Sequence, residues 1–239
     1  MTQIGLNCDV GEGIGNDAAI MPFIHSCNIA CGGHAGNEQI MEDTIKLGID
    51  NQVKIGAHPS YPDKENFGRQ VMDLPREELI QSIKAQIEKL NSLAIKLGAR
   101  LSHVKPHGTL YNQATKEENE AHCIIEAMSN FEKLSLYAPY KSVIAELAEQ
   151  AGIHVMYEAF ADRQYNDDLT LVSRTIDGSV LHDENSVIEH VQRVISDNKI
   201  ITRSGKTVDI KVDTICVHGD NPKALEIVKS IYREFFQES

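Results

Sequence analysis

The chain has 239 residues, of which 41% are hydrophobic and 24% charged, as in an ordinary globular domain. Its formal net charge of −12 argues against nucleic acid or an anionic membrane surface as the main partner, because both bind basic faces. No apolar run approaches the roughly 20 residues that span a bilayer, and MTQIGLNCDV lacks the pattern of a signal peptide, so we expect a cytoplasmic protein.

Short apolar segments alternate with longer segments of helical periodicity. We expect strands to begin at seven positions: Ile4, Cys27, Val53, Leu101, Leu134, His154 and Val212. We expect helices over six ranges: Glu38–Gly48, Pro75–Leu97, Lys116–Ser129, Lys141–Gln150, Asn185–Ser196 and Pro222–Phe236. This alternation predicts a parallel α/β sheet, closed or open. No repeat or linker interrupts it, so residues 1–239 form one predicted domain.

The clearest helix is PREELIQSIKAQIEKLNSLAIKLG, at residues 75–98. Its apolar residues step by three or four positions: Leu79, Ile83, Ile87, Leu90, Ala94 and Leu97. Pro75 suits the first turn, and Gly98 is a natural stop. In contrast, ITRSGKTVDI at residues 201–210 predicts a hairpin with a tight turn at Ser204-Gly205, inserted before the last strand.

Polar segments follow six of the predicted strands, at the point where each strand ends. In chain order they are NCDVGEGIG, NIACGGHAGN, GAHPSYPD, KPHGTLYN, AFADRQY and HGD. The carboxyl ends of parallel strands lie on one face, where α/β proteins build their active sites. We therefore expect these segments to line one shared cleft.

Four residues in these segments are the catalytic candidates. Asp9 directly follows the first strand, where a carboxylate serves as a base or a ligand. His58 and His107 follow the third and fourth strands, as proton carriers or as metal ligands. Lys105 ends a central strand, so it points into the cleft, toward an anionic substrate or a transferring phosphoryl group.

A second set is predicted to bind substrate or phosphate: Glu12, His34, Arg69, Asp162, Arg163, His218 and Asp220. For Glu12 the competing interpretation is that its carboxylate only caps a helix or stabilises a turn. For Asp162 and Arg163 it is that they form a structural ion pair. His103 lies one alternation step from Lys105 on the same side of the strand, so we predict a buried, hydrogen-bonded support.

The sequence leaves open whether a divalent metal ion binds. Asp9 with His34 and His58 would supply the nitrogen and oxygen ligands that such an ion takes, although no HExxH motif is present. The chain has five cysteines, an odd number, and no CxxC motif. Both facts argue against a disulfide framework or a zinc knuckle. We predict reduced thiols, buried where they fall at strand ends.

The chain resembles the LamB/YcsF family in seven segments taken in order: LNCDVGEGIG, NIACGGHAGN, GAHPSYPD, FGRQ, HVKPHGTLYN, FADRQY and CVHGD. The resemblance covers essentially the whole chain. It implies a seven-stranded (β/α) barrel, TIM-like and similar to glycoside hydrolases and deacetylases. It also implies the A subunit of an ATP-dependent 5-oxoprolinase, which works with subunits B and C and cleaves 5-oxo-L-proline (pyroglutamate) to L-glutamate while ATP is hydrolysed to ADP and phosphate.

The reaction that the resemblance implies suits these residues. A lactam amide is a weak electrophile, and phosphorylation of its oxygen would make an imidate that water attacks. Lys105 with Arg69 or Arg163 would hold the phosphate, and the other catalytic candidates would supply a base and an acid. The chain has no GxxxxGK[ST] loop, and GEGIGN does not complete GxGxxG. ATP is therefore expected to bind in another way or at a subunit interface.

Three positions depart from the family pattern. Gly33 stands where the family usually has an aromatic residue, which we expect to widen the pocket. Asn37 stands where aspartate is usual, and Leu169 where glycine is usual. None of these departures removes a charged candidate.

Two other functions compete with the oxoprolinase interpretation. A stand-alone, metal-dependent, deacetylase-like hydrolase of a C–N bond would hold a divalent ion on Asp9 with two histidines and would need no ATP. A binding subunit would only present substrate to its partners, and substitution of Asp9 or His107 would then leave the assembled complex active.

Overall fold

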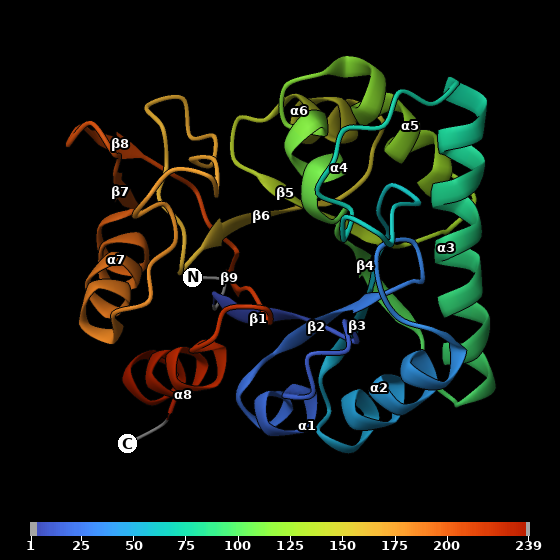
Figure 1. Ribbon diagram of the computed structural model, residues 1–239, viewed down its shortest axis with the longest axis horizontal. Helices are drawn as coiled ribbons and strands as arrows, with labels where there is room; N and C mark the ends of the chain where they lie inside the picture. The colour runs from blue at the N-terminus through green and yellow to red at the C-terminus, as the bar shows by residue number, and fades with distance from the viewer. Residues whose placement is uncertain (1–3, 238–239) are drawn as a thin grey trace.

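The computed structural model describes residues 4–237, and its strands form a closed parallel barrel in the order β1-β2-β3-β4-β5-β6-β9 (Figure 1). The barrel strands are β1 (Gly5–Val10), β2 (Ser26–Ala30), β3 (Lys54–His58), β4 (Leu101–Val104), β5 (Ser135–Pro139), β6 (Val155–Phe160) and β9 (Thr214–Val217). The barrel closes because β9 pairs in parallel with both β1 and β6. Each predicted strand is present and begins within two residues of its predicted start.

Helices surround the barrel (Figure 1). They are α1 (Asp17–Ile20), the 3-10 turn η1 (Met21–Phe23), α2 (Glu38–Asp50), α3 (Arg76–Lys96), α4 (Gly108–Ala114), α5 (Glu118–Met128), α6 (Val143–Gln150), α7 (Glu184–Asp197) and α8 (Ala224–Phe235). The six predicted helices are confirmed with shifts of one or two residues at their ends. The sequence pattern did not predict α1, η1 or α4. In the part of the chain that the structure describes, no helix is long and apolar enough to cross a membrane.

Helix α3 shows how the sequence positions these helices. Pro75 is its N-cap, and Gly98, just after its end, has a φ of +82°, a conformation that favours glycine. The stepped apolar residues Leu79, Ile83, Ile87 and Leu90 are all buried. Their burial fixes the face that α3 turns toward the rest of the barrel, as the periodicity predicts.

The hairpin is a separate two-stranded sheet outside the barrel. Strands β7 (Lys199–Ile201) and β8 (Thr207–Asp209) pair antiparallel, and Gly205 in the turn has a φ of +87°. Figure 1 shows the hairpin beside α7, on the opposite side of the molecule from α3. The predicted turn at Ser204-Gly205 is therefore confirmed.

The barrel interior is polar beneath its carboxyl-terminal mouth. Asn28 donates to Asn7 Oδ1 and to Asp9 Oδ1, both at 2.8 Å, and His103 Nε2 donates to Asn28 Oδ1 at 2.7 Å. Asn7 in turn donates to Thr214 Oγ1 at 2.8 Å. His103 is thus the buried, hydrogen-bonded support that the strand alternation predicts. Because each of these bonds joins different strands, the network fixes the height of Asp9 in the barrel.

Candidate active site

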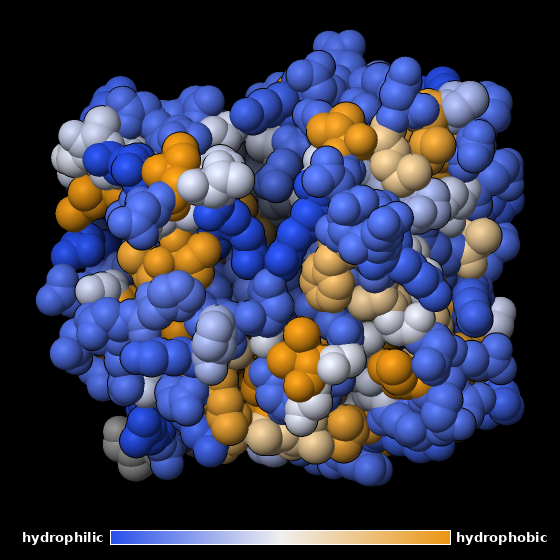
Figure 2. Space-filling model, in the orientation of Figure 1, coloured by the Kyte–Doolittle hydropathy of each residue, from blue (hydrophilic) through white to orange (hydrophobic). Residues whose placement is uncertain are grey.

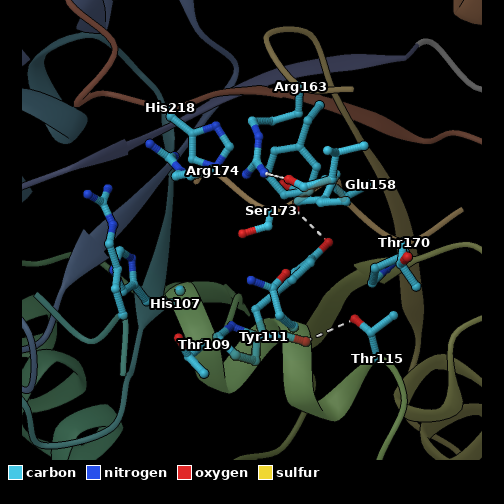
Figure 3. Close-up of a pocket in the computed structure, with 18 of the residues that line it drawn as sticks. His107, Thr109, Tyr111, Thr115, Glu158, Arg163, Thr170, Ser173, Arg174 and His218 are labelled. Carbon is cyan, nitrogen blue, oxygen red and sulfur yellow. Dashed lines mark hydrogen bonds between the residues drawn. The ribbon is translucent and has the colours of Figure 1, made fainter. Parts of the chain in front are cut away.

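A cavity of about 420 Å³ opens at the carboxyl-terminal ends of the barrel strands. Figure 3 shows two groups of side chains facing each other across it. One group follows β4 and lies on α4, and the other lies on the segment of residues 161–183 after β6; their labelled members include His107, Thr109, Tyr111 and Thr115, and Arg163, Ser173 and Arg174. Figure 2 shows a hollow between the same regions, bordered mainly by hydrophilic residues. The predicted shared cleft is present.

Lys105 is the centre of the cavity floor. Its Nζ lies 2.9 Å from Asp9 Oδ1, 3.1 Å from Glu158 Oε1 and 2.9 Å from the Cys216 sulfur. Burial alone would lower the pKa of Lys105, but Asp9, Cys216 and Glu158 together raise it well above its ordinary value. Burial would likewise raise the pKa of Asp9, but Lys105 and His58 hold it well below its ordinary value. At neutral pH the floor therefore holds a buried Lys105 ammonium beside the Asp9 carboxylate.

Three histidines and a glutamate lie beside this floor. His58 Nε2 is 3.5 Å from Asp9 Oδ2 and 3.0 Å from His107 Nδ1. Glu12 Oε1 is 3.4 Å from His107 Nδ1 and 3.1 Å from His34 Nε2. Glu12, His34, His58 and His107 each offer a potential ligand atom, and these atoms lie within 4.8 Å of one another. This buried cluster could hold a metal ion.

The same burial perturbs these groups. Desolvation is the main cause that lowers the pKa of His34 to about 2 and the pKa of His107 well below its ordinary value, and in both cases neighbouring histidines add to the effect. Desolvation and the Asp9 charge raise the pKa of Glu12 well above its ordinary value. Neutral imidazoles with free lone pairs are ligands of a zinc-type site, and the Glu12 carboxyl group would have to lose its proton to join them.

Arginines from different loops border the cavity. Asp220, after β9, is paired with Arg69, after β3, and lies 3.1 Å from Arg174 Nη1. Arg163 is almost fully buried and donates from Nη2 to the Val172 carbonyl. Its Nε has no hydrogen-bond partner among residues 4–237. Burial and the nearby Arg174 lower the pKa of Arg163 to about 10, so the guanidinium is still charged at neutral pH.

The structure separates the predicted site residues into two groups. Those that line the cavity are Asp9, His58, Arg69, Lys105, His107, Arg163 and His218. The others lie behind or beside them: Glu12 and His34 contact His107, and Asp220 links two arginines. Asp162 is fully buried and accepts from His218 Nδ1 at 2.8 Å and from Asn221 at 3.0 Å. Asp162 therefore positions His218 and makes no ion pair with Arg163.

Several site residues were not predicted. Glu158 contacts Lys105 and accepts from the Tyr111 hydroxyl at 3.0 Å, and Asn28 supports Asp9. The detectable signal for Glu158 was an acid inside the apolar strand VMYEAF, since a buried acid needs a partner. All five cysteines are buried and none is paired in a disulfide, so their predicted burial is confirmed. Their reduced state stays a prediction.

One expectation was wrong. Gly33 does not widen the cavity, because the space beside it is filled: a Cβ there would overlap Gln86 Oε1 and come within 2.5 Å of Ser60 Oγ. Gln86 is held in place by hydrogen bonds to the backbone of Ser60, at 3.0 and 2.8 Å. Asn37 caps α2 by accepting from Ile40 N, a role that aspartate also performs.

Fold and site together define a (β/α)-barrel protein whose strand ends carry one buried, ionisable centre, the arrangement of barrel enzymes. The chain belongs to the LamB/YcsF family, whose model matches residues 4–239. A relative from Pyrococcus horikoshii, which is named as the A subunit of 5-oxoprolinase, is 44% identical over 99% of this chain and 95% of its own length. A relative of the same name from Staphylococcus haemolyticus is 42% identical over 99% of this chain and 97% of its own length.

Solved structures agree with the architecture. The crystal structure of a lactam utilization protein from Thermus thermophilus matches with a TM-score of 0.89 and 32% identity, over 97% of this chain and 96% of that one. A family 4 carbohydrate esterase from Streptomyces lividans matches with a TM-score of 0.50 and 9% identity, over 97% of this chain and 86% of that one, and so shows the fold alone. The expected seven-stranded (β/α) barrel is confirmed.

Proposed function

We propose that this chain is the A subunit of an ATP-dependent 5-oxoprolinase, which works with subunits B and C and hydrolyses 5-oxo-L-proline to L-glutamate. The observation that carries the proposal is the family match over residues 4–239, with relatives named as 5-oxoprolinase A subunits that align along nearly their whole length. The lactam utilization protein with the same fold agrees with it. The cytoplasmic location stays a prediction.

The chemistry that we assign begins with the lactam oxygen. It attacks the γ-phosphorus of ATP, ADP leaves, and a phosphorylated imidate forms. Water then adds to the ring carbon and loses a proton to a base. The C–N bond breaks as the nitrogen takes up a proton, and a second water releases phosphate from the resulting acyl phosphate. The overall reaction consumes one ATP and two waters for each glutamate.

The cavity floor supplies the charges that this route needs. Lys105 is held between Asp9 and Glu158, so its ammonium is fixed before the reaction and can stabilise charge that develops on the lactam or phosphoryl oxygens. Asp9, His58 and His107 are the candidates for the base that takes the proton from water and the acid that protonates the nitrogen. Arg69 and His218, which also line the cavity, are assigned to phosphate.

Arg163 is assigned to the carboxylate of 5-oxoproline. Its guanidinium is buried, lines the cavity and forms no ion pair within residues 4–237 that would neutralise it. Asp220, an acid on this rim, already pairs with Arg69 and Arg174. A buried arginine with unused donors favours a planar carboxylate, which accepts two parallel hydrogen bonds.

Glutamate release from 5-oxoproline tests the proposal. We expect ATP-dependent glutamate release when this chain is mixed with subunits B and C, and none from the chain alone. In the mixture, Asp9→Asn is expected to lower kcat by about 10²- to 10⁴-fold, since it removes the charge and keeps the shape. Asp43→Asn, on an exposed helix face, is the matched control.

Each contrary result has a definite meaning. No glutamate from the complete mixture, with all three subunits folded, would refute the oxoprolinase assignment. Full activity of the Asp9→Asn mixture would show that this chain only presents substrate to its partners. Activity of the chain alone without ATP would favour the stand-alone hydrolase.

A further inference from the structure

The contacts of His58 and His107 fix where their protons lie. His58 Nδ1 is 2.7 Å from the carbonyl oxygen of Lys105, and His107 Nε2 is 3.0 Å from the carbonyl oxygen of Phe67. A carbonyl oxygen only accepts, so both of these ring nitrogens carry hydrogen. In the neutral rings, His58 Nε2 and His107 Nδ1 are then the lone-pair nitrogens. These two atoms face each other at 3.0 Å.

Two lone pairs at this distance repel each other unless a positive charge lies between or beside them. Two carboxyl groups flank the pair: Asp9 Oδ2 is 3.5 Å from His58 Nε2, and Glu12 Oε1 is 3.4 Å from His107 Nδ1. Asp9 Oδ1 is already used by Lys105 and Asn28, at 2.9 and 2.8 Å, which leaves Oδ2 as its free oxygen. The four atoms thus follow one another at 3.5, 3.0 and 3.4 Å, and Glu12, His58 and His107 belong to a group whose potential ligand atoms all lie within 4.8 Å of one another.

From this arrangement we infer that Glu12, His58 and His107, with Asp9 beside His58, form a binding site for one divalent transition-metal ion of the zinc type. Three of the six ligand–ligand separations of such a site are 3.0, 3.4 and 3.5 Å. They are close to the roughly 3.3 Å between neighbouring ligand atoms of a tetrahedral site with bonds near 2.0–2.1 Å. Histidine ligands commonly donate their other N–H to a backbone carbonyl, as both rings do here.

His34 is a supporting residue of this site and is not one of its ligands. Its ring is stacked on His107 at 3.6 Å between centroids with an interplanar angle of 0°. A metal bond lies close to the plane of an imidazole, so two parallel rings at this spacing cannot both aim at one ion. His34 Nε2 lies 3.1 Å from Glu12 Oε1 and can donate to it, which orients the Glu12 ligand. The ligand set expected from sequence, Asp9 with His34 and His58, changes accordingly.

The site concerns the same cluster as the proposed function but does not depend on the lactam reaction. A bound ion would make Asp9, His58 and His107, which are the base and acid candidates named above, its ligands, and the proton transfers would then fall to other groups. Such an ion supplies Lewis-acid chemistry and lowers the pKa of bound water.

The test is metal binding by the purified full chain, measured without substrate or the other subunits. Metal-free chain is titrated with Zn²⁺ by calorimetry and with Co²⁺ by absorption, which reports tetrahedral coordination. We expect one ion per chain. His107→Ala and Glu12→Gln should weaken binding by more than about 100-fold, His34→Ala by about 10- to 100-fold with the stoichiometry kept, and exposed His122→Ala not at all.

Failure of the folded wild-type chain to bind either ion would overturn the inference. A proton shared between His58 and His107, seen by NMR of the metal-free chain and unchanged when Zn²⁺ is added, would also overturn it, because the proton would then take the place of the ion. If His34→Ala lowered the metal affinity as much as His107→Ala does, His34 would have to be counted as a ligand. Metal binding without oxoprolinase activity in the full mixture would leave this inference standing and refute only the proposed function.

Discussion

Arg163 shows how a single residue can set substrate choice in this cavity. Its burial fixes the guanidinium, and its Nη2 bond to Val172 leaves the remaining donors for a ligand. If the lactam carboxylate occupies them, Arg163→Lys keeps the charge but loses the paired hydrogen bonds. A lost hydrogen bond to a charged group is worth about 1.5–3 kcal/mol. We therefore expect the KM for 5-oxoproline to rise about 10- to 100-fold in the assembled complex, with a smaller change in kcat.

Steady-state kinetics with 5-oxoproline and ATP varied separately check this prediction. Arg203→Lys is the matched control, because Arg203 lies in the exposed turn of the β7–β8 hairpin. A rise in the KM for ATP alone would assign Arg163 to phosphate instead. Unchanged values for both substrates would remove Arg163 from the binding site.

Single residues also show which parts of such a site can be predicted from the sequence. Strand-end positions identified Asp9, His58, Lys105 and His107, because the carboxyl ends of parallel strands meet at one face. Which atoms come into contact depends on the strand register and on the path of the loops. Neither can be predicted from the local sequence pattern. The contact between Glu12 and His34 depends on two loops that pass through positive-φ glycines, such as Gly11 and Gly36. Their meeting could not be predicted.

At the scale of elements, strand β3 shows how a glycine makes room for the polar interior. Gly56 lies opposite His103 in the parallel pairing of β3 with β4, and a Cβ at Gly56 would overlap the His103 ring. That ring also stacks on Tyr137 at 3.9 Å, so it has little freedom to move. A glycine inside a strand commonly marks such a close approach.

We expect Gly56→Ala to lower the free energy of unfolding by about 3 kcal/mol, because overpacking a well-packed interior costs about 1–3 kcal/mol and the His103 bond to Asn28 is disturbed as well. Urea denaturation of the chain measures the change. Gly5→Ala in β1 is the matched control, because the nearest atom to its Cβ would lie at 3.6 Å. Equal stabilities for the two variants would show that His103 moves aside freely.

Helices with several turns were predictable, and the shortest were not. Helix α3 repeats its apolar spacing over 21 residues, so the period is unmistakable. Helix α4 has only seven residues and begins directly after the segment KPH, which is typical of a strand end and a turn. Its buried residues Leu110, Tyr111 and Ala114 fit a helical face, but they are too few to separate a helix from a loop.

At the scale of the whole molecule, buried neutral histidines link folding to pH. Burial is the main cause that lowers the pKa of His103 to about 3 and the pKa of His190 to about 4. His103 lies inside the barrel, whereas His190 joins helix α7 to β6 by donating to the Phe160 carbonyl at 3.1 Å. Below the ordinary histidine pKa of about 6.5, the unfolded chain takes up protons at these positions and the folded chain does not. Stability must therefore fall as the pH falls through this window.

His190 allows this effect to be measured one residue at a time. Each pH unit between about 6.5 and its folded pKa of about 4 costs about 1.4 kcal/mol, or about 3 kcal/mol over the window. His190→Gln removes this proton uptake and can keep the bond to Phe160. We expect its free energy of unfolding, measured in urea with a chelator present, to fall less steeply with acid than that of the wild type. Exposed His122→Gln should follow the wild type. Parallel pH curves for His190→Gln and wild type would mean that His190 takes up its proton at the same pH in the folded and the unfolded chain.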